Sequence, residues 1–272
     1  MGSLDGKVVF ITGASRGIGR EIALKFASEG AQVALAAKSS EPHPTLPGTI
    51  HTVAEDIRKL GTAALPLRVD VRDAGALANA IERTVQEFGG LDILVNNASA
   101  ISPTGLLDTP ARKFDLLSAV NGRATYICAY YAVPHLKRSS NPHVLTLSPP
   151  LPKSAIWLGK YPAYATSKYS MTMYTLALAE EFRSFGIAAN ALWPKTMIAT
   201  DAVRVHYQSD YRRSRSPSIM ADAAHFIVTQ DSREFSGRTL IDEEVLRSQG
   251  VDDLSVYAID PTSQLAPDIL IE

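Results

Sequence analysis

A phenol and an ammonium group stand four residues apart in Tyr164-Ala165-Thr166-Ser167-Lys168. Four residues are about one helical turn, so in a helix both side chains lie on the same face. A free tyrosine is a poor acid–base catalyst at neutral pH because its pKa is about 10, but a nearby cation favours the phenolate and lowers that pKa. The pair therefore indicates proton-transfer chemistry. The alternative is that Tyr164 and Lys168 merely cover a helix surface.

A glycine-rich turn is the second candidate for chemistry, and it reads Gly13-Ala14-Ser15-Arg16-Gly17-Ile18-Gly19. Glycines let the backbone turn tightly and approach a pyrophosphate, which a helix N-terminus stabilises through its free N–H groups and its dipole. The turn follows a β-rich run and begins a helical stretch, which is the order that this mechanism requires. It therefore predicts nucleotide binding, with a glycine turn used only for packing as the alternative.

The choice of nucleotide depends on the end of the second β-rich run, Ala36-Ala37-Lys38-Ser39-Ser40, which has no carboxylate. An acidic residue there would bond the adenosine ribose hydroxyls and repel a 2′-phosphate. Lys38 and Arg16 can instead pair with that phosphate. The predicted cofactor is therefore NADP(H), and the alternative is that both residues are ordinary solvated cations.

These motifs lie in a regular alternation of β-rich runs and helical stretches. The runs that predict strands are 7–11, 32–37, 64–71, 93–95, 143–147 and 187–192, and those that predict helices are 18–28, 52–60, 73–88, 114–136 and 163–185. Strands alternating with helices of this length imply right-handed crossovers and a parallel sheet covered on both faces. The predicted fold is a Rossmann-type, doubly wound α/β sheet in a single domain, 1–272. Its nucleotide-binding half would span about 6–100, and its catalytic half and substrate loop about 101–272.

Two segments interrupt the alternation. Residues 39–48 contain Pro42, Pro44 and Pro47 and predict an irregular loop. Residues 197–218 follow the sixth strand and are polar and basic, with four arginines: Arg204, Arg212, Arg213 and Arg215. Ligands in such sheets bind beyond the carboxyl ends of the strands, so this second segment is placed to cover a substrate. The alternative is a mobile surface loop with solvated arginines.

Composition narrows the possible functions. The 27 Lys+Arg against 28 Asp+Glu give a net charge of −1, so no basic field indicates a nucleic-acid partner. The single cysteine, Cys128, excludes an intrachain disulfide framework and indicates a reducing compartment, and we interpret it as a small buried apolar residue. No apolar run approaches the roughly 18 residues of a membrane span. The six histidines include no pair spaced for a catalytic metal, so none is expected.

Several of these signals together resemble the short-chain dehydrogenase/reductase family. The glycine turn, Asp70-Val71, Asn96-Asn97-Ala98, Asn121 and the Tyr164–Lys168 segment occur in the order and approximate spacing of that family, over about residues 6–200. Further stretches resemble one narrower group within it, among them Ala36-Ala37-Lys38, Pro42-His43-Pro44, Ser148-Pro149-Pro150 and 191–196. Fuller relatives in that group carry an additional sterol-carrier-like domain, which this chain is expected to lack.

The resemblance implies a role for each matched position. Gly13–Gly19 would bind the pyrophosphate, Lys38 the 2′-phosphate, and Asp70 with Val71 the adenine. Asn96 would bind the nicotinamide ribose, and Thr196 would bind the carboxamide. Tyr164 would exchange a proton with a carbonyl oxygen as hydride moves to or from the nicotinamide. Lys168 would bind the nicotinamide ribose hydroxyls and depress the Tyr164 pKa, and Asn121 would hold a water in a proton relay.

One departure from the family concerns the residue that holds the substrate oxygen. The family places a serine about thirteen residues before the tyrosine, whereas that position here is Leu151 and the usual Ser-Ser pair reads Ser148-Pro149. Ser148 can serve as a catalytic residue only if the Pro149-Pro150 turn shifts it. Otherwise it is an ordinary hydroxyl at the end of a strand.

The expected function is therefore an NADP(H)-dependent oxidoreductase that interconverts a carbonyl and an alcohol on a small or lipophilic substrate, with a place in lipid metabolism by analogy alone. The alternative is an NADP(H)-binding regulatory or scaffold protein with vestigial catalysis. The resemblance also implies a homodimer or homotetramer. The expected location is the cytoplasm, with the peroxisomal or mitochondrial matrix as the alternative.

Overall fold

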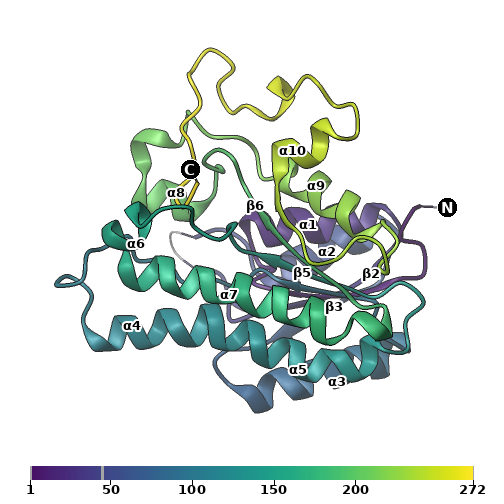
Figure 1. Cartoon of the computed structure of the whole chain (residues 1–272). Coiled ribbons are helices and arrows are strands. Elements are labelled where there is room, and N and C mark those ends of the chain that lie inside the picture. The colour runs from purple at the N-terminus through teal and green to yellow at the C-terminus, as the bar shows by residue number, and fades with distance from the viewer. Residues whose placement is uncertain (1, 44–45, 272) are drawn as a thin grey trace.

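Seven parallel strands form one sheet in the computed structural model, which describes residues 2–43 and 46–271 (Figure 1). Their order across the sheet is β3-β2-β1-β4-β5-β6-β7. The strands are β1 (Val8–Thr12), β2 (Gln32–Ala37), β3 (Ala64–Arg68), β4 (Ile93–Asn96), β5 (His143–Leu147), β6 (Ala188–Trp193) and β7 (Thr239–Ile241). The chain runs outward from β1 to β3 and then crosses to β4, so the winding reverses between β1 and β4. In open α/β sheets, ligands bind beyond the carboxyl ends of the strands at this reversal.

Helices connect the strands. They are α1 (Gly17–Ser28), α2 (Ile50–Lys59), α3 (Ala74–Phe88), α4 (Ala111–Ser118), α5 (Ala124–Leu136), α6 (Ile156–Lys160), α7 (Pro162–Glu181), α8 (Asp201–His206), α9 (Ser218–Val228) and α10 (Asp242–Arg247). A π-helical turn, η1 (Ala119–Arg123), joins α4 to α5, and three short 3₁₀ turns are η2 (Arg183–Phe185), η3 (Gln208–Asp210) and η4 (Ser255–Tyr257). None of the helices in the described part of the chain combines the length and apolarity needed to cross a bilayer.

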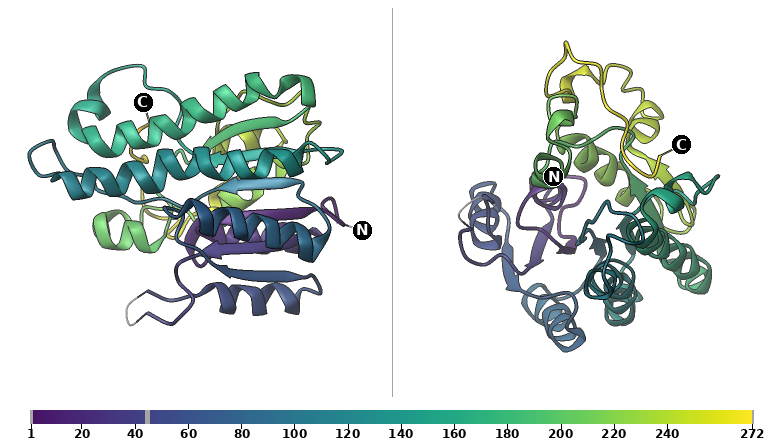
Figure 2. Two further views of the ribbon diagram at one scale, coloured as in Figure 1. Left: turned by 90° about the horizontal axis from the view of Figure 1, so that it is seen from below. Right: turned by 90° about the vertical axis from the view of Figure 1, so that its left-hand side faces the viewer.

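Two helical layers enclose the sheet (Figure 2). Helices α1, α2 and α9 pack on one face, and α3, α5 and α7 pack on the other. Strand β1 shows how the sequence produces this arrangement, because its side chains alternate between the faces. Val9 and Ile11 pack with Ile22 of α1, whereas Val8 and Phe10 belong to the opposite core. A strand that is buried on both faces needs apolar residues throughout, as β1 has.

The structure confirms the predicted doubly wound α/β fold. The predicted strands 32–37 and 143–147 coincide with β2 and β5. The single helix predicted over 114–136 is a helical path that begins earlier, at Ala111, and is interrupted by the π-helical turn. The sequence patterns do not predict α6, α8, α9, α10 or β7.

The structure agrees with the prediction for the first irregular segment and differs from it for part of the second. The described part of the segment after β2 contains neither helix nor strand until α2, as its prolines predict, and Pro44 lies outside the described residues. The segment 197–218 instead contains α8 and η3. Its Arg215 is 6% exposed and forms an ion pair with Glu243 of α10. The alternative of solvated arginines is therefore wrong for Arg215, because its guanidinium group is buried.

The C-terminal tail, defined as residues 259–271, returns across one end of the sheet to the region of α8 (Figure 1). Its backbone is bound to the segment that follows β6: the Met197 N–H donates to the Ala266 carbonyl at 2.9 Å, and the Asp268 N–H donates to the Lys195 carbonyl at 3.1 Å. Thr196 and Pro267 form an antiparallel bridge between these bonds. The tail thereby becomes a wall at the carboxyl ends of the strands.

Candidate functional site

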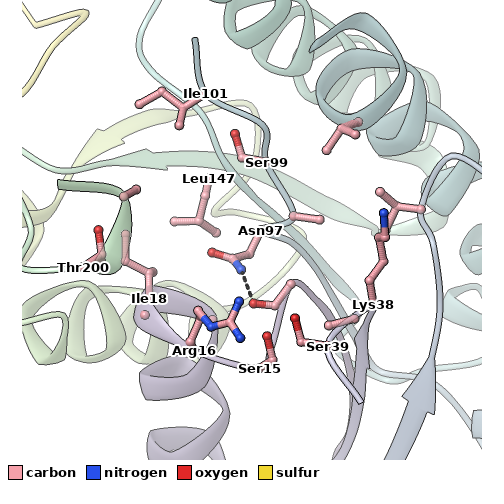
Figure 3. Close-up of a pocket in the computed structure, with 18 of the residues that line it drawn as sticks. Ser15, Arg16, Ile18, Lys38, Ser39, Asn97, Ser99, Ile101, Leu147 and Thr200 are labelled. Atoms are coloured by element: carbon pink, nitrogen blue, oxygen red, sulfur yellow. Dashed lines mark hydrogen bonds between the residues drawn. The ribbon is translucent and has the colours of Figure 1, made fainter. Parts of the chain in front are cut away.

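A cleft of about 460 Å³ opens at the carboxyl ends of the strands, where the winding reverses (Figure 3). Segments far apart in the sequence line it, including the glycine turn after β1, the end of β2, the loop after β4 and one face of α7. It brings together most of the residues that the sequence singles out: Gly13, Ser15, Arg16, Gly17, Ile18, Gly19, Lys38, Asp70, Val71, Tyr164 and Lys168. Those that do not line the cleft are Ala14, Asn96, Asn121, Ser148 and Thr196.

The glycine turn is shaped by close backbone contacts. A Cβ atom on Gly13 would lie 2.8 Å from Asn97 Nδ2 and 2.9 Å from Ala98 Cα, so no larger residue fits there without movement. Asn97 Nδ2 donates to the carbonyls of Thr12 and Gly13, which holds the loop after β4 against the turn (Figure 3). Arg16 provides no side-chain cap for α1. The N–H groups at the start of this helix therefore remain available to an anion.

Two cations, Arg16 and Lys38, line the cleft. Arg16 donates through its guanidinium group to the carbonyls of Pro47 at 3.1 Å and Gly48 at 2.9 Å, so it holds the segment before α2. The Lys38 side chain is 65% exposed, and its Nζ lies 3.5 Å from Asp70 Oδ2. An exposed ammonium group with one distant partner can bind a phosphate with little reorganisation.

Asp70 is an anion rather than a neutral carboxyl. Hydrogen bonds from the Arg72 guanidinium group hold the Asp70 pKa well below its usual range, and the positive charge of Lys38 lowers it further. Val71 follows it in the cleft wall. This end of the cleft therefore combines Lys38 and Arg72 with one carboxylate that Arg72 already engages.

Tyr164 and Lys168 lie on the first two turns of α7, which begins with a proline at its first helical position. Proline is well suited to this position because its fixed φ matches the helix and its missing N–H is not needed there. The two side chains are 4% and 1% exposed. Lys168 Nζ donates to the Leu147 carbonyl at 2.6 Å and lies 5.0 Å from the Trp193 ring centroid.

Burial dominates the ionisation of both groups. It lowers the pKa of Lys168 to about 7, an effect that the nearby carboxyl group of Asp268 opposes. It also raises the pKa of the Tyr164 phenol, and the neighbouring Asp268 and Tyr207 raise it further. The expectation that the lysine lowers the tyrosine pKa is therefore not met here, because the environment that surrounds the phenol also disfavours a charge on the amine.

Asn121 lies in the π-helical turn η1 and is fully buried. Its Oδ1 accepts from the Ala100 N–H at 2.8 Å, and its Nδ2 donates to the Ala100 carbonyl at 3.0 Å and to Ser167 Oγ at 2.8 Å. The side chain thus ties the loop after β4 to α7. Its hydrogen-bonding groups are used within the protein, so the geometry supports a positioning role for the Asn121 side chain.

Ser148 does not reach the cleft. Its hydroxyl is fully buried and accepts from Thr172 Oγ1 of α7 at 2.8 Å. The preceding residue, Leu147, lines the cleft instead. The Ser148 hydroxyl is therefore not placed to bind the oxygen of a substrate in the cleft.

Two other predicted residues carry buried polar atoms without a hydrogen-bond partner among the described residues. They are the side-chain amide of Asn96 and Oγ1 of Thr196. Buried polar groups are almost always hydrogen-bonded, so such atoms beside a cleft are expected to be satisfied by a ligand or by water. The described residues contain no cluster of His, Cys, Asp or Glu that could hold a metal ion.

A smaller cavity of about 110 Å³ continues from the cleft at Tyr164, and Trp193 belongs to the walls of both. Apolar side chains from the segment after β6, from α8 and α9 and from the tail supply most of its wall, and the polar residues Thr200, Tyr207 and Asp268 lie in the same wall. The sequence patterns indicated the segment 197–218 as a substrate cover but assigned no role to Trp193, which ends β6, or to Asp268. The packing of the tail places Asp268.

Comparisons with known proteins agree with this geometry. The family model described as short chain dehydrogenase matches residues 7–210. Over its full 272 residues the chain is 50% identical to hydroxysteroid dehydrogenase-like protein 2 of Danio rerio and 48% identical to that of Homo sapiens, which confirms the narrower resemblance. The chain spans 65% of the length of each of these relatives.

Solved structures are similar over nearly the same extent. A putative dehydrogenase from Xanthomonas campestris matches with a TM-score of 0.96 and 49% identity, covering 99% of both chains. A short chain dehydrogenase from Burkholderia cenocepacia J2315, solved in complex with NADP, matches with a TM-score of 0.76 and 29% identity, covering 88% of this chain and 97% of that one.

Proposed function

The chain belongs to the short-chain dehydrogenase/reductase family, and from that premise we propose that it is an NADP(H)-dependent oxidoreductase that interconverts a carbonyl and an alcohol on a small or lipophilic substrate. One observation carries the proposal. Tyr164 and Lys168 lie buried on one face of α7 and line the same cleft as the glycine turn, Gly13–Gly19. Acid–base and nucleotide-binding groups thus meet in one space.

The residues present fit a dinucleotide. Gly13 and the uncapped start of α1 would hold its pyrophosphate. By the family resemblance, Asn96 and Thr196 would serve its nicotinamide end, although neither lines the cleft among the described residues. Lys38, with Arg16, would pair with the 2′-phosphate, which the absence of a carboxylate at the end of β2 supports. The bound cofactor supplies the hydride chemistry.

Tyr164 would move the proton. Its raised pKa keeps the phenol protonated at neutral pH, so in the reducing direction it can donate that proton to a substrate oxygen. In the oxidising direction the phenol must first lose the proton, which a positive charge on Lys168 would favour. Because the Lys168 pKa is about 7, that charge responds to small changes in its surroundings near neutral pH.

The direct test is the variant Tyr164→Phe, which keeps the ring and removes only the hydroxyl. NADPH oxidation is followed by absorbance over a panel of ketones and aldehydes, and NADPH affinity is measured by fluorescence titration. We expect turnover to fall by about 100-fold or more, as general acid catalysis contributes, with little change in NADPH affinity. Tyr169→Phe, at another buried tyrosine of α7, is the matched control. Equal turnover in Tyr164→Phe and the wild type would exclude the proposed role.

The orientation of Ser148 favours a second candidate function, an NADP(H)-binding regulatory or scaffold protein with vestigial catalysis. Its hydroxyl bonds Thr172 rather than facing the cleft, so the group that usually polarises the substrate oxygen is absent from that position. The same assays separate the candidates. Nucleotide binding without Tyr164-dependent turnover on any member of the panel would support the second.

Exposed aromatic side chains support a homodimer or homotetramer. Tyr126 and Tyr130 of α5 are 52% and 64% exposed, and Met173 and Tyr174 of α7 are 61% and 38% exposed. Tyr126 and Tyr174 contact each other edge to face at 5.5 Å between ring centroids. Apolar groups gathered on neighbouring helices are typical of an interface. Light scattering coupled to gel filtration would give the number of subunits.

A further inference from the structure

Asp268 is the carboxyl-bearing residue among the described residues that line the apolar cavity beside Tyr164. Its neighbours in the cavity wall include Met197, Val203 and Met220. The residue is 9% exposed. A carboxyl group in such surroundings is costly unless it is neutral or well bonded, so its presence at this place requires an explanation.

The tail holds Asp268 rigidly in the cavity wall. On one side its N–H donates to the Lys195 carbonyl at 3.1 Å. On the other side, Trp193 Nε1 donates to the Ile269 carbonyl at 3.0 Å, and Trp157 Nε1 donates to the Ile271 carbonyl at 2.9 Å. Two indole rings and the segment after β6 therefore fix the backbone on both sides of the carboxyl group.

The buried surroundings of Asp268 favour its protonated form. Burial raises its pKa well above the usual range, and the nearby carboxyl group of Asp242 raises it further. The backbone N–H of Ile269, the amine of Lys168 and the Trp193 indole oppose this shift, in that order of size, without cancelling it. The Ile269 N–H and the Trp193 indole can only donate hydrogen bonds, so neither can accept one from the O–H of a protonated acid.

The position of Ser148 makes such a donor significant. Its hydroxyl faces Thr172 and does not line the cavity. A carbonyl oxygen bound beside Tyr164 accepts two hydrogen bonds and receives one from the phenol. The oxygen can therefore take a second hydrogen bond from a donor in the same cavity, and Asp268 lies there.

We propose that Asp268 donates a hydrogen bond from the O–H of its carboxyl group to an uncharged oxygen of the substrate bound against Tyr164, and so selects substrates in which an apolar group carries such an oxygen, as in a ketone. The inference deepens the proposed function and rests on it. Tyr164 and Asp268 both line this cavity of about 110 Å³. A substrate oxygen held against Tyr164 therefore lies in the same small space as Asp268.

The test compares Asp268→Asn and Asp268→Leu with the wild type. Asparagine keeps a hydrogen-bond donor of nearly the same shape without an ionisable proton, whereas leucine removes the donor and fills the space. With 2-octanone and cyclohexanone as probes, we expect kcat/KM to fall about 10- to 100-fold in Asp268→Leu, as for one buried hydrogen bond to substrate, and less than about 5-fold in Asp268→Asn. NADPH affinity should stay unchanged in both. Asp252→Leu, at an exposed carboxylate, is the matched control.

Binding of 2-octanone to the NADP⁺-loaded protein provides a readout that does not depend on turnover. The two tryptophans of the chain are Trp157 and Trp193, and both bond the tail that carries Asp268. Their fluorescence therefore reports occupation of the cavity. We expect affinity for 2-octanone to fall about 10-fold or more in Asp268→Leu and to be restored in Asp268→Asn, with circular dichroism confirming that each variant is folded.

The outcomes separate this inference from the proposed function. If binding of 2-octanone depends on Asp268 but the protein shows no turnover, the inference stands and the proposed oxidoreductase activity is refuted. Equal kcat/KM and affinity in all three proteins would overturn the inference while leaving Tyr164-dependent turnover untouched. The inference would also be overturned if Asp268→Asn lost as much kcat/KM and affinity as Asp268→Leu. The substrate would then require a carboxylate charge rather than a donated hydrogen bond.

Discussion

Replacement of Lys168 by methionine should change how the stability of the protein depends on pH. The Lys168 pKa falls from its ordinary 10.5 to about 7 because the ammonium group is buried. The unfolded chain keeps the ordinary value, so between pH 7 and pH 10.5 it binds more protons than the native state does. Stability therefore rises with pH across this window in the wild type. Methionine has no proton to lose, so the variant lacks this contribution.

The magnitude follows from the size of the shift. A difference between 10.5 and about 7 corresponds to about 5 kcal/mol, at about 1.4 kcal/mol per pKa unit. About 2 kcal/mol of this is recovered between pH 7 and pH 9, since the native amine is half protonated at the start of that range. The variant also loses the bond from Lys168 Nζ to the Leu147 carbonyl, but that loss depends only weakly on pH. The pH dependence of the difference in unfolding free energy between the wild type and Lys168→Met therefore reports the ionisation of Lys168.

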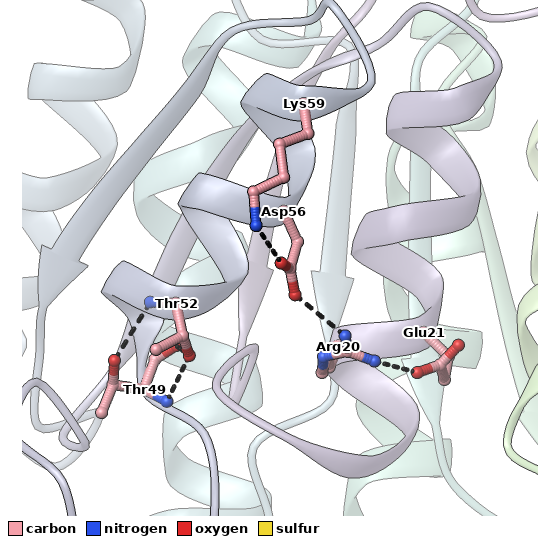
Figure 4. Close-up of polar contacts among 6 residues, drawn as sticks. All are labelled: Arg20, Glu21, Thr49, Thr52, Asp56 and Lys59. Atoms are coloured by element: carbon pink, nitrogen blue, oxygen red, sulfur yellow. Dashed lines mark hydrogen bonds and ion pairs between the residues drawn. The ribbon is translucent and has the colours of Figure 1, made fainter.

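Urea unfolding of the cofactor-free protein, followed by far-ultraviolet circular dichroism at pH 7, 8 and 9, measures this difference. We expect the free energy of unfolding of the wild type, minus that of Lys168→Met, to rise by about 2 kcal/mol from pH 7 to pH 9. Lys59→Met is the control, because the Lys59 side chain is 76% exposed and its ammonium group pairs with the exposed Asp56 (Figure 4). A difference that stays constant over this range would show that burial does not depress the Lys168 pKa.

Three further variants test the cleft. Lys38→Ala should weaken NADPH binding about 5- to 30-fold with little effect on NADH, as expected for one partly exposed ion pair; an unchanged preference in fluorescence titration would remove the basis of the cofactor assignment. Gly17→Ala should lower the free energy of unfolding in urea by about 1–2 kcal/mol, because Gly17 has a φ of +57°. Gly90→Ala is the control and should leave that free energy nearly unchanged, because a Cβ there would contact none of the described residues. Asn121→Ala should cost about 2–4 kcal/mol by the same measurement, since it leaves the Ala100 N–H and carbonyl without their side-chain partner; a loss below about 1 kcal/mol would contradict the positioning role.

Local signals explain which elements could be predicted. Thr49 and Thr52 form a capping box at the start of α2, where each side chain bonds the backbone of the other (Figure 4). Such a signal depends on neighbouring residues alone, but the predicted helix 52–60 does not use it and begins two residues later than α2. Helix α9 (Ser218–Val228) is apolar on most sides and offers no amphipathic period, and β7 (Thr239–Ile241) has only three residues. Neither presents a clear periodic pattern to a reader of the sequence.

The π-helical turn at Asn121 shows a limit of periodicity. The sequence predicts one regular helix over 114–136, but the structure inserts a wider turn at this residue. The turn coincides with the bonds from Asn121 to Ala100 and Ser167. Those partners lie 21 and 46 residues away in the chain, so no local pattern contains the information.

The chain's own order of residues determined the parts of the site whose members are close in sequence. The glycine turn follows β1 directly, and Tyr164 and Lys168 share a helix face because four residues make about one turn. Packing alone decided the rest. It turned Ser148 toward Thr172 and brought Asp268, about a hundred residues beyond Tyr164, to the same cavity. The reason is physical: backbone geometry relates near neighbours through fixed torsions, whereas distant segments meet only where burial of apolar surface drives them together.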